Sequence, residues 1–199
     1  MSALELGPQG LASHLDWRAG LPLMVTSRVV LRELRRSDAP ALLRIARSPD
    51  VARYSWPPPA TVDAFERFIK WAWSERAVGK YTCFAAVPRD QNEPGGLFEL
   101  RPLQPNFFRA ELGLFMDPPN WDNGVFHDGA RLVCEFAFKV IGVHRIEMRS
   151  PVSHTACNAA LEKLGVHREG VLRSSFSHNG QFEDQYLWSL VNGLDRLNL

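Results

Sequence analysis

The sequence predicts an α/β fold with a mixed sheet, and three observations support this. Segments with strand alternation and segments with helical spacing follow one another in the order β, α, α, β, β, β, α, β, α, β, β. Hydrophobic residues make up 45% of the chain and charged residues 23%, which is typical of a globular protein and excludes disorder. The length of 199 residues fits one domain with some excess. We expect an N-terminal extension over residues 1–22 and one domain over residues 23–199.

The first elements are a strand and a helix. Residues 1–22 lack periodicity and contain several glycines and prolines, so we expect them to lie on the fold, to be loose, or to form a dimer contact. Residues 24–34 alternate as a strand does. Ser37 is then the expected N-cap of a helix over residues 38–47, which ends before Pro49.

A proline-rich loop, a helix and three strands follow. Residues 53–60 contain three consecutive prolines, which remove hydrogen-bond donors and fix φ, so they predict a rigid loop. The next helix is expected over residues 61–77. Strands are expected over residues 81–87, 95–103 and 109–116, and their short connections predict an antiparallel meander.

The last part of the chain predicts two more helices and three more strands. Apolar residues recur at helical spacing over residues 125–141, and Gly165 is a typical residue for ending the second of these helices. An Asn-Gly turn at Asn179 and Gly180 predicts a closing hairpin. The other expected ranges are a strand over 144–150, a helix over 155–164 and strands over 170–178 and 182–191.

Composition excludes several classes of protein. The three cysteines are far apart and form no CxxC pair, so neither a disulfide framework nor a cysteine zinc site is expected. No histidine and carboxylate spacing indicates a metal. A formal net charge of +1 creates no field toward nucleic acid or anionic lipid. Since residues 1–24 do not resemble a secretory signal and residues 132–143 are too short to span a bilayer, we expect a soluble cytoplasmic protein.

The stretch NWDNGVFHDGA, residues 120–130, joins a strand to a long amphipathic segment. Gly124 lets the backbone approach an anion, and the first N–H groups of the helix favour negative charge. Asp122 and Asp128 oppose an anion there. The stretch is therefore either a cradle for an anion or a simple turn.

Several short stretches, in this order and spacing, resemble the GNAT superfamily of acyl-CoA-dependent N-acyltransferases, within the Rim-type branch that includes ribosomal-protein N-terminal acetyltransferases. The resemblance implies the GNAT fold, a single mixed and mostly antiparallel twisted sheet with helices on both faces. The stretches extend over roughly residues 24–191 and read RVVLREL with DAPALLRIA, AELGLFMDPPNWDNG, FAFKVIGVHRIEMR, NAALEKLGVHREGVLR and NGQFEDQYLW.

The resemblance also implies a cofactor site for acetyl-CoA or another short acyl-CoA, without a metal. The pyrophosphate signature Q/R-x-x-G-x-G/A falls on residues 121–126, with Phe126 where the signature has glycine or alanine. The preceding strand, splayed from its neighbour in relatives, is implied to hold the pantetheine arm through its backbone. The implied cofactor-binding residues are Leu114, Phe115, Met116, Asn123, Gly124, Val125, Phe126, His154 and Asn158.

The family reaction is attack of an amine on the thioester, assisted by a base and an acid. Phe176 and Cys157 stand where the closest Rim-type pattern has Glu and Ser. Glu111 and Glu147 are possible replacement bases acting through water, or else salt-bridging groups. Cys157 either has a lowered pKa, donates its S–H to the departing sulfur, or is a small buried residue.

The loop over residues 53–60 is the best candidate for contact with the acceptor. Tyr54 and Trp56 either wall the acceptor slot or cover the end of the sheet, and His154 either lies near the pantetheine or caps a helix. The resemblance implies acyl transfer to a primary amine of a protein N-terminus or small molecule, by a monomer or homodimer, with no nucleic-acid or membrane partner. The alternatives are a catalytically impaired CoA-binding or protein-interaction module, and a structural dimer component.

Overall fold

The structure is a computed structural model that describes residues 15–54, 58–193 and 195. The strands are β1 Met24–Val25, β2 Val29–Glu33, β3 Thr82–Pro88, β4 Gly96–Pro102, β5 Arg109–Met116, β6 Arg145–Pro151, β7 His167–His178 and β8 Gln181–Val191. The helices are α1 Ala39–Ala46, α2 Pro49–Ala52, α3 Val62–Ala77, α4 Val125–Phe136 and α5 Thr155–Leu164. Short 3-10 turns cover residues 36–38, 105–107 and 118–120.

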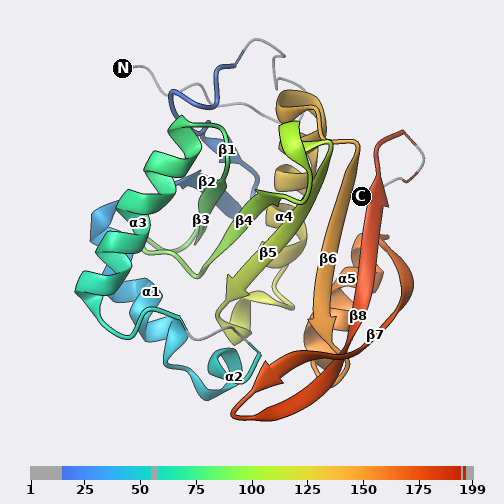
Figure 1. Cartoon of the computed structure of the whole chain (residues 1–199). Coiled ribbons are helices and arrows are strands. Elements are labelled where there is room, and N and C mark those ends of the chain that lie inside the picture. The colour runs from blue at the N-terminus through green and yellow to red at the C-terminus, as the bar shows by residue number, and fades with distance from the viewer. Residues whose placement is uncertain (1–14, 55–57, 194, 196–199) are drawn as a thin grey trace.

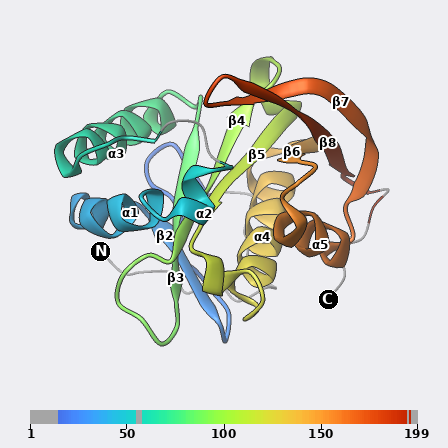
Figure 2. The same cartoon turned by 90° about the horizontal axis from the view of Figure 1, so that it is seen from below.

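The strands form one sheet in the order β1-β2-β3-β4-β5-β6-β8-β7 (Figure 1). All neighbours are antiparallel except β5 and β6, which are parallel. Helices α1 and α3 lie on one side of the sheet, and α4 and α5 lie on the other (Figure 2). The predicted α/β fold with a mixed sheet and helices on both faces is confirmed.

The start of the chain differs from the prediction in three details. The expected strand over residues 24–34 is two short strands, because the Thr26 hydroxyl accepts the N–H groups of Arg28 and Val29 and makes a turn. Ser37 is not an N-cap, since it lies inside the 3-10 turn and Asp38 precedes α1. Pro49 begins α2 instead of only following a helix, because its fixed φ suits the first helical position.

The remaining elements follow the prediction closely. Thr61 caps α3 by accepting the N–H of Ala64, and β3, β4 and β5 form the expected meander. The long predicted helix is α4 followed by a π-helical segment over residues 137–141. Asn179 and Gly180 have φ values of 50° and 76°, which the predicted two-residue hairpin turn requires.

Residues of β3, β4 and β5 alternate between two hydrophobic cores. Even-numbered residues such as Phe84 and Phe98 face α4 and α5, whereas odd-numbered ones such as Ala85 and Leu97 face α1 and α3. Where α1 and α3 no longer cover the sheet, the second face becomes charged. We call this the charged face, and its residues are Glu99, Arg101, Arg109, Glu111, Arg145, Glu147 and Arg149.

Strands β5 and β6 are paired only at their beginnings. The paired residues are Arg109 with Arg145, Ala110 with Ile146 and Glu111 with Glu147. Residues 112–116 of β5 continue in partnership with β4 alone. We call the loss of pairing after Glu111 the β5–β6 divergence.

Residues just before β1 pack on the domain. Trp17 is buried in the core on the α4 side, with its ring 5.8 Å from that of Phe107. Arg76 of α3 donates hydrogen bonds to the backbone carbonyls of Trp17 and Arg18. In the described part of the chain, no helix has the length and apolarity needed to cross a bilayer.

Candidate active site

The β5–β6 divergence exposes one edge of β5 to possible ligands. The N–H and C=O groups that β5 would direct toward β6 have no ladder partner beyond Glu111, which leaves them free to bind an extended amide chain. Leu114 and Phe115 are half-buried and Met116 is buried, so these side chains contribute to the cores. The separation of β5 from β6 agrees with the splayed strand that the family resemblance implies.

The loop after β5 ends at the N-terminus of α4. Gly124 has φ of 87° and occupies the N-cap in the left-handed conformation. The side-chain carbonyl of Asn123 accepts the N–H of Val125 at 3.0 Å, and its amide donates to Asn120. The N–H groups of Phe126 and His127 have no hydrogen-bond partner among the described residues. These two amides, at the positive end of the helix dipole, can bind an anion.

Phe126 does not obstruct these amides. Its side chain is 1% exposed, and its ring lies 4.9 Å from the ring of Trp121 and 6.2 Å from the ring of Phe98. The ring therefore points into the core between α4 and β4. The bulk that departs from the family signature is directed away from the place where phosphates would bind.

A cation lies beside the loop, although the loop itself contains none. Arg28, in the turn between β1 and β2, places Cδ only 2.5 Å from the position that a Cβ on Gly124 would occupy. Its Nη1 lies 3.2 Å from Asp128 Oδ1, which offsets one of the two opposing carboxylates. Sequence reasoning missed Arg28 because it precedes Asp128 by 100 residues and no local pattern marks it.

The N-terminus of α5 is the opposite wall of the divergence. His154 is the N-cap, and its Nδ1 accepts the N–H of Cys157 at 3.5 Å, so the capping role is confirmed. Its ring stacks on Tyr54 at 4.0 Å and meets the edge of Trp121 at 5.3 Å. Burial lowers the pKa of His154 to about 4, so the ring is neutral near pH 7.

The predicted loop residues are only partly described. The hydroxyl of Tyr54 donates to the Ser153 carbonyl at 3.3 Å, which connects the end of α2 to the start of α5. Trp56 lies outside the described residues. Tyr54 therefore lies beside the divergence, and its role toward an acceptor stays a prediction.

Cys157 lies in the first turn of α5, on the α4 side of the sheet. The residue is 6% exposed, and burial raises the pKa of its thiol to about 12. A lowered pKa is therefore wrong for Cys157, and the protonated thiol is the form present at neutral pH. Of the predicted roles, S–H donation and plain burial agree with this state.

Asn158 connects α5 to the end of β6. Its side-chain carbonyl accepts the Ser150 hydroxyl at 2.6 Å, and its amide donates to the carbonyls of Pro151 and Val152 at 3.2 and 3.1 Å. Trp188 in turn donates to the Ser150 hydroxyl at 2.8 Å. Asn158 thus fixes the wall of the site, and direct contact with a cofactor stays a prediction.

The two predicted bases are both held in ion pairs on the charged face. Glu111 lies 2.8 Å from Arg101 and 4.0 Å from Arg149. Glu147 lies 2.7 Å from Arg109 and 2.9 Å from Arg145.

Ion pairing determines the protonation of Glu147. Burial opposes ionisation of this carboxyl, but the hydrogen bonds from Arg145 and Arg109 outweigh burial and lower its pKa. A carboxylate held in this way is a weak proton acceptor.

A third carboxylate on the charged face, Glu99, was missed by sequence reasoning. It accepts a hydrogen bond from the Tyr81 hydroxyl and lies opposite Gly113 in the β4–β5 ladder. Strand alternation alone places Glu99 on the same face as Arg101 and Glu111, and that signal was available in the sequence. Phe176, at the position of the absent glutamate, is buried and its ring is parallel to that of His178.

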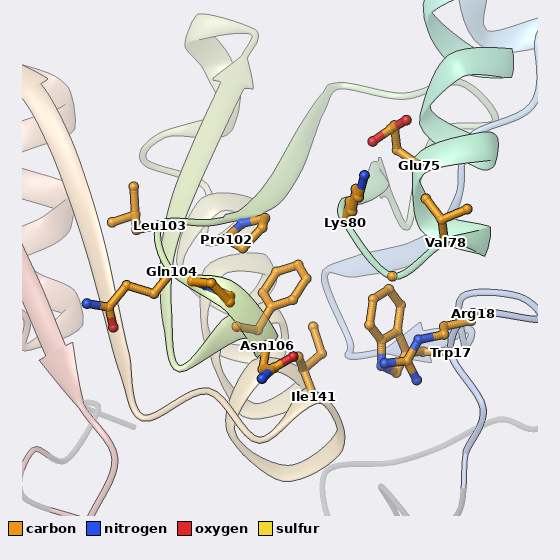
Figure 3. A pocket seen from close by; sticks show the side chains of 13 residues that line it. Trp17, Arg18, Glu75, Val78, Lys80, Pro102, Leu103, Gln104, Asn106 and Ile141 are labelled. Atoms are coloured by element: carbon orange, nitrogen blue, oxygen red, sulfur yellow. The ribbon is translucent and has the colours of Figure 1, made fainter.

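Two cavities lie near the end of α3, away from the α4 N-terminus. One, of about 750 Å³, is lined by side chains including Trp17, Arg18 and Ile141, at the end of β5 opposite Gly124 (Figure 3). The other, of about 380 Å³, is lined by Phe68, Trp71, Glu75, Lys80, Tyr81, Glu99 and Arg101. Across the described ranges, no group of three or more His, Cys, Asp or Glu side chains is arranged to hold a metal ion.

Comparison with known proteins agrees with this geometry. Residues 28–167 match the acetyltransferase (GNAT) domain. The uncharacterized N-acetyltransferase YoaA of Bacillus subtilis is 28% identical over 182 residues, which are 85% of this chain and 97% of that protein.

Two solved structures share the fold. Mycobacterium smegmatis RimJ in complex with CoA-disulfide has a TM-score of 0.73 at 20% identity, covering 82% of each chain. The ribosomal-protein-S5-alanine acetyltransferase of Vibrio fischeri has a TM-score of 0.75 at 17% identity, covering 84% of this chain and 95% of the other. Together with the matched domain, the divergence of β5 from β6 and the glycine at the start of α4 lead to one conclusion: the chain belongs to the GNAT acetyltransferase family.

Proposed function

We propose that this protein is a cytoplasmic acetyl-CoA-dependent N-acetyltransferase acting on a primary amine of a protein N-terminus or small molecule. One observation carries the proposal. The free edge of β5 leads directly to the N-terminus of α4, where two amides have no partner in the described chain, Phe126 is turned into the core and Arg28 supplies a cation.

The magnitudes favour binding of a diphosphate at this helix end. Hydrogen bonds from backbone amides to a charged acceptor contribute roughly 1.5 to 3 kcal/mol each. The interaction of one charge with a helix end is about 0.3 to 1 kcal/mol, and a neighbouring carboxylate cancels much of one such favourable interaction. The amides of Phe126 and His127 therefore outweigh the repulsion from Asp122 and Asp128, and Arg28 reduces it further.

The divergence supplies the second part of the cofactor site. Backbone groups of Leu114, Phe115 and Met116 would hold the pantetheine arm, since amides of an extended chain pair with a free strand edge. Cys157, protonated at neutral pH, would donate its S–H to the departing sulfur. The sequence predicted Glu111 and Glu147 as bases acting through water, and arginines hold both carboxylates in ion pairs.

The chemical demand on the enzyme is modest for an α-amine. With a pKa of about 8, such an amine loses its proton at pH 7.5 at a cost of about 0.8 kcal/mol, against about 4 kcal/mol for a lysine side chain. Holding the amine and the thioester in line supplies much of the remaining rate. Phe176 in place of the family's glutamate therefore does not by itself imply an inactive enzyme.

A direct assay tests the proposal. Purified protein is incubated with acetyl-CoA and a set of amines, which comprises tripeptides with free N-termini, spermidine and simple alkylamines. Release of free thiol and a matching mass increase of 42 Da, the mass of an added acetyl group, in the amine are expected for at least one class. Propionyl-CoA in place of acetyl-CoA measures acyl preference.

Calorimetry with CoA separates the alternatives. Binding without turnover of any amine would favour a CoA-binding module, and absence of both would favour a scaffold role for the fold. Gel filtration with light scattering, on the full chain and on a variant lacking residues 1–22, tests whether the N-terminal extension forms a dimer contact.

A further inference from the structure

Glu99 lies at the point where β5 leaves β6. Its Cα pairs with that of Gly113, which is two residues beyond the last paired residue, Glu111. A Cβ on Gly113 would lie 2.6 Å from Glu99 Oε1. The carboxylate therefore lies directly over the backbone of β5 at the divergence, in space that is free only because residue 113 is glycine.

The three carboxylates of the charged face differ in their partners. Glu111 and Glu147 are each bound by arginines. Glu99 accepts a hydrogen bond from the Tyr81 hydroxyl and forms no ion pair with any described residue. Burial raises the pKa of Glu99 above its ordinary value, although the Tyr81 hydrogen bond partly offsets this effect. A raised pKa makes a carboxylate a better proton acceptor.

Glu99 is also reached from a cavity. The cavity of about 380 Å³ extends from the exposed ring of Trp71 and from Phe68 to Tyr81 and Glu99. Aromatic faces and a carboxylate are a suitable environment for an ammonium group. Glu75 and Lys80, labelled in Figure 3, also line the cavity of about 750 Å³, so the two cavities adjoin near the end of α3.

We propose that Glu99 binds the ammonium group of the acceptor and accepts its proton, and that the acceptor enters through the cavity beside Trp71. The inference rests on the proposed function and assigns its catalytic base and acceptor route. Tyr81 is the positioning residue, since its hydroxyl orients the carboxylate.

The step is balanced in protons and bonds. Glu99 takes one proton from the ammonium group, which gives a neutral amine and a carboxylic acid. The amine nitrogen then forms a bond to the acetyl carbon as the carbon–sulfur bond breaks. The second proton lost by nitrogen ends on the sulfur, so the products are an N-acetyl amine and free CoA thiol, and Glu99 releases its proton to solvent.

Other ionisable groups face Glu99 and shape its titration. Arg101 favours the ionised form and Glu111 disfavours it. The groups that surround the carboxylate are Tyr81 just before β3, Cys83 in β3, Arg101 in β4, Glu111 in β5, and Glu75 and Lys80 around the cavity.

The test compares Glu99→Gln with the wild type, using the best amine from the direct assay. Glutamine retains an oxygen for the Tyr81 hydroxyl but cannot take a proton. We expect kcat/KM for the amine to fall about 100-fold or more, with the Kd for acetyl-CoA within about twofold. In the wild type, log kcat/KM plotted against pH should be flat between the pKa of Glu99 and the pKa of the amine. In the variant, it should rise with unit slope up to the pKa of the amine.

Three further variants complete the test. Glu93→Gln, on an exposed loop carboxylate paired with Arg44, is the matched control and leaves activity unchanged. Trp71→Ala alters an exposed ring on the cavity and is expected to raise KM for the amine without changing acetyl-CoA binding. Glu111→Gln is expected to retain the flat pH profile.

The outcomes separate the two proposals. Wild-type turnover with a flat profile retained in Glu99→Gln would overturn the assignment of Glu99 and leave the transferase standing. A change of profile in Glu111→Gln instead would also overturn it. If Glu99→Gln does not fold, an unchanged KM in Trp71→Ala overturns the route and the assignment with it. Absence of turnover in wild type removes both proposals together.

Discussion

Replacement of Gly124 by alanine tests the central feature of the cofactor site. At φ of 87° a residue with a Cβ is strained by roughly 1 to 2 kcal/mol. The new Cβ would also lie 2.5 Å from Arg28 Cδ and 2.9 Å from Nε, so the arginine must move. Since Arg28 is more than half exposed, it can rotate away at small cost, and the backbone strain dominates the loss of stability.

The expected effect on folding is therefore moderate and the effect on binding larger. A loss of about 1 to 2 kcal/mol lowers the melting temperature of a domain of this size by roughly 2 to 8 °C. If relaxation of the strained turn rotates one amide away from the diphosphate, binding loses about 1.5 to 3 kcal/mol. That loss corresponds to a Kd for acetyl-CoA about 10- to 150-fold higher, measured by calorimetry.

Gly142→Ala is the matched control for this experiment. Gly142 has φ of 85°, almost the same backbone strain, and a Cβ there would meet no atom within 4 Å. It follows the π-helical segment at the far end of α4, so the variant should lose similar stability and retain acetyl-CoA affinity. Equal affinity in wild type and both variants would refute the reasoning, as would an equal loss in both variants.

Three other substitutions are informative. Arg28→Gln is expected to raise the Kd for acetyl-CoA about 1.5- to 5-fold, because Arg28 is more than half exposed and an exposed charge pair contributes about 0.2 to 1 kcal/mol. The affinity for S-acetylpantetheine, which lacks the diphosphate, should be unchanged. The pKa of His154 in the folded protein is about 4, below its value in the unfolded chain. Its contribution to stability is therefore complete above about pH 6.5 and is lost as the pH falls toward 4. His154→Asn retains a capping group and should flatten the pH dependence of the free energy of unfolding between these two pH values. Asn158→Leu removes three hydrogen bonds and should lower that free energy by about 1 to 3 kcal/mol in urea titrations, whereas Asn192→Leu, outside the site, should change it little.

Local signals predicted the order of the elements. Alternation identified β3, β4 and β5, and Thr61, Gly165 and the Asn179–Gly180 turn marked boundaries that the structure confirms. The prediction of Ser37 as the N-cap was wrong. The carboxylate of Asp38 accepts the Arg35 N–H and two hydrogen bonds from the Arg32 guanidinium, which are stronger partners than a serine hydroxyl offers. Such competition between neighbouring caps depends on the position of Arg32, which the local pattern does not report.

The candidate site was predictable where it depends on the backbone and not where it depends on tertiary contacts. Gly124 could be found from its place between a strand and a helix. The direction of the Phe126 ring, the position of Arg28 and the arginine partners of Glu147 depend on packing of segments far apart in the chain. The arginine partners of Glu147 matter most for the choice of base, because they lower the pKa of its carboxyl. A glutamate in a strand sequence gives no indication of such neighbours.

Because β5 and β6 share few residue pairs, the sheet consists of two weakly connected blocks of strands. Strands β1 to β5 form one continuous ladder and strands β6 to β8 another, joined by three residue pairs and by the packing of α4 against α5. Local opening of either ladder then need not break the other, so amide hydrogens in the two blocks can exchange with solvent at different rates. A molecule seated between them would connect the blocks, and protection from exchange would rise on both sides at once.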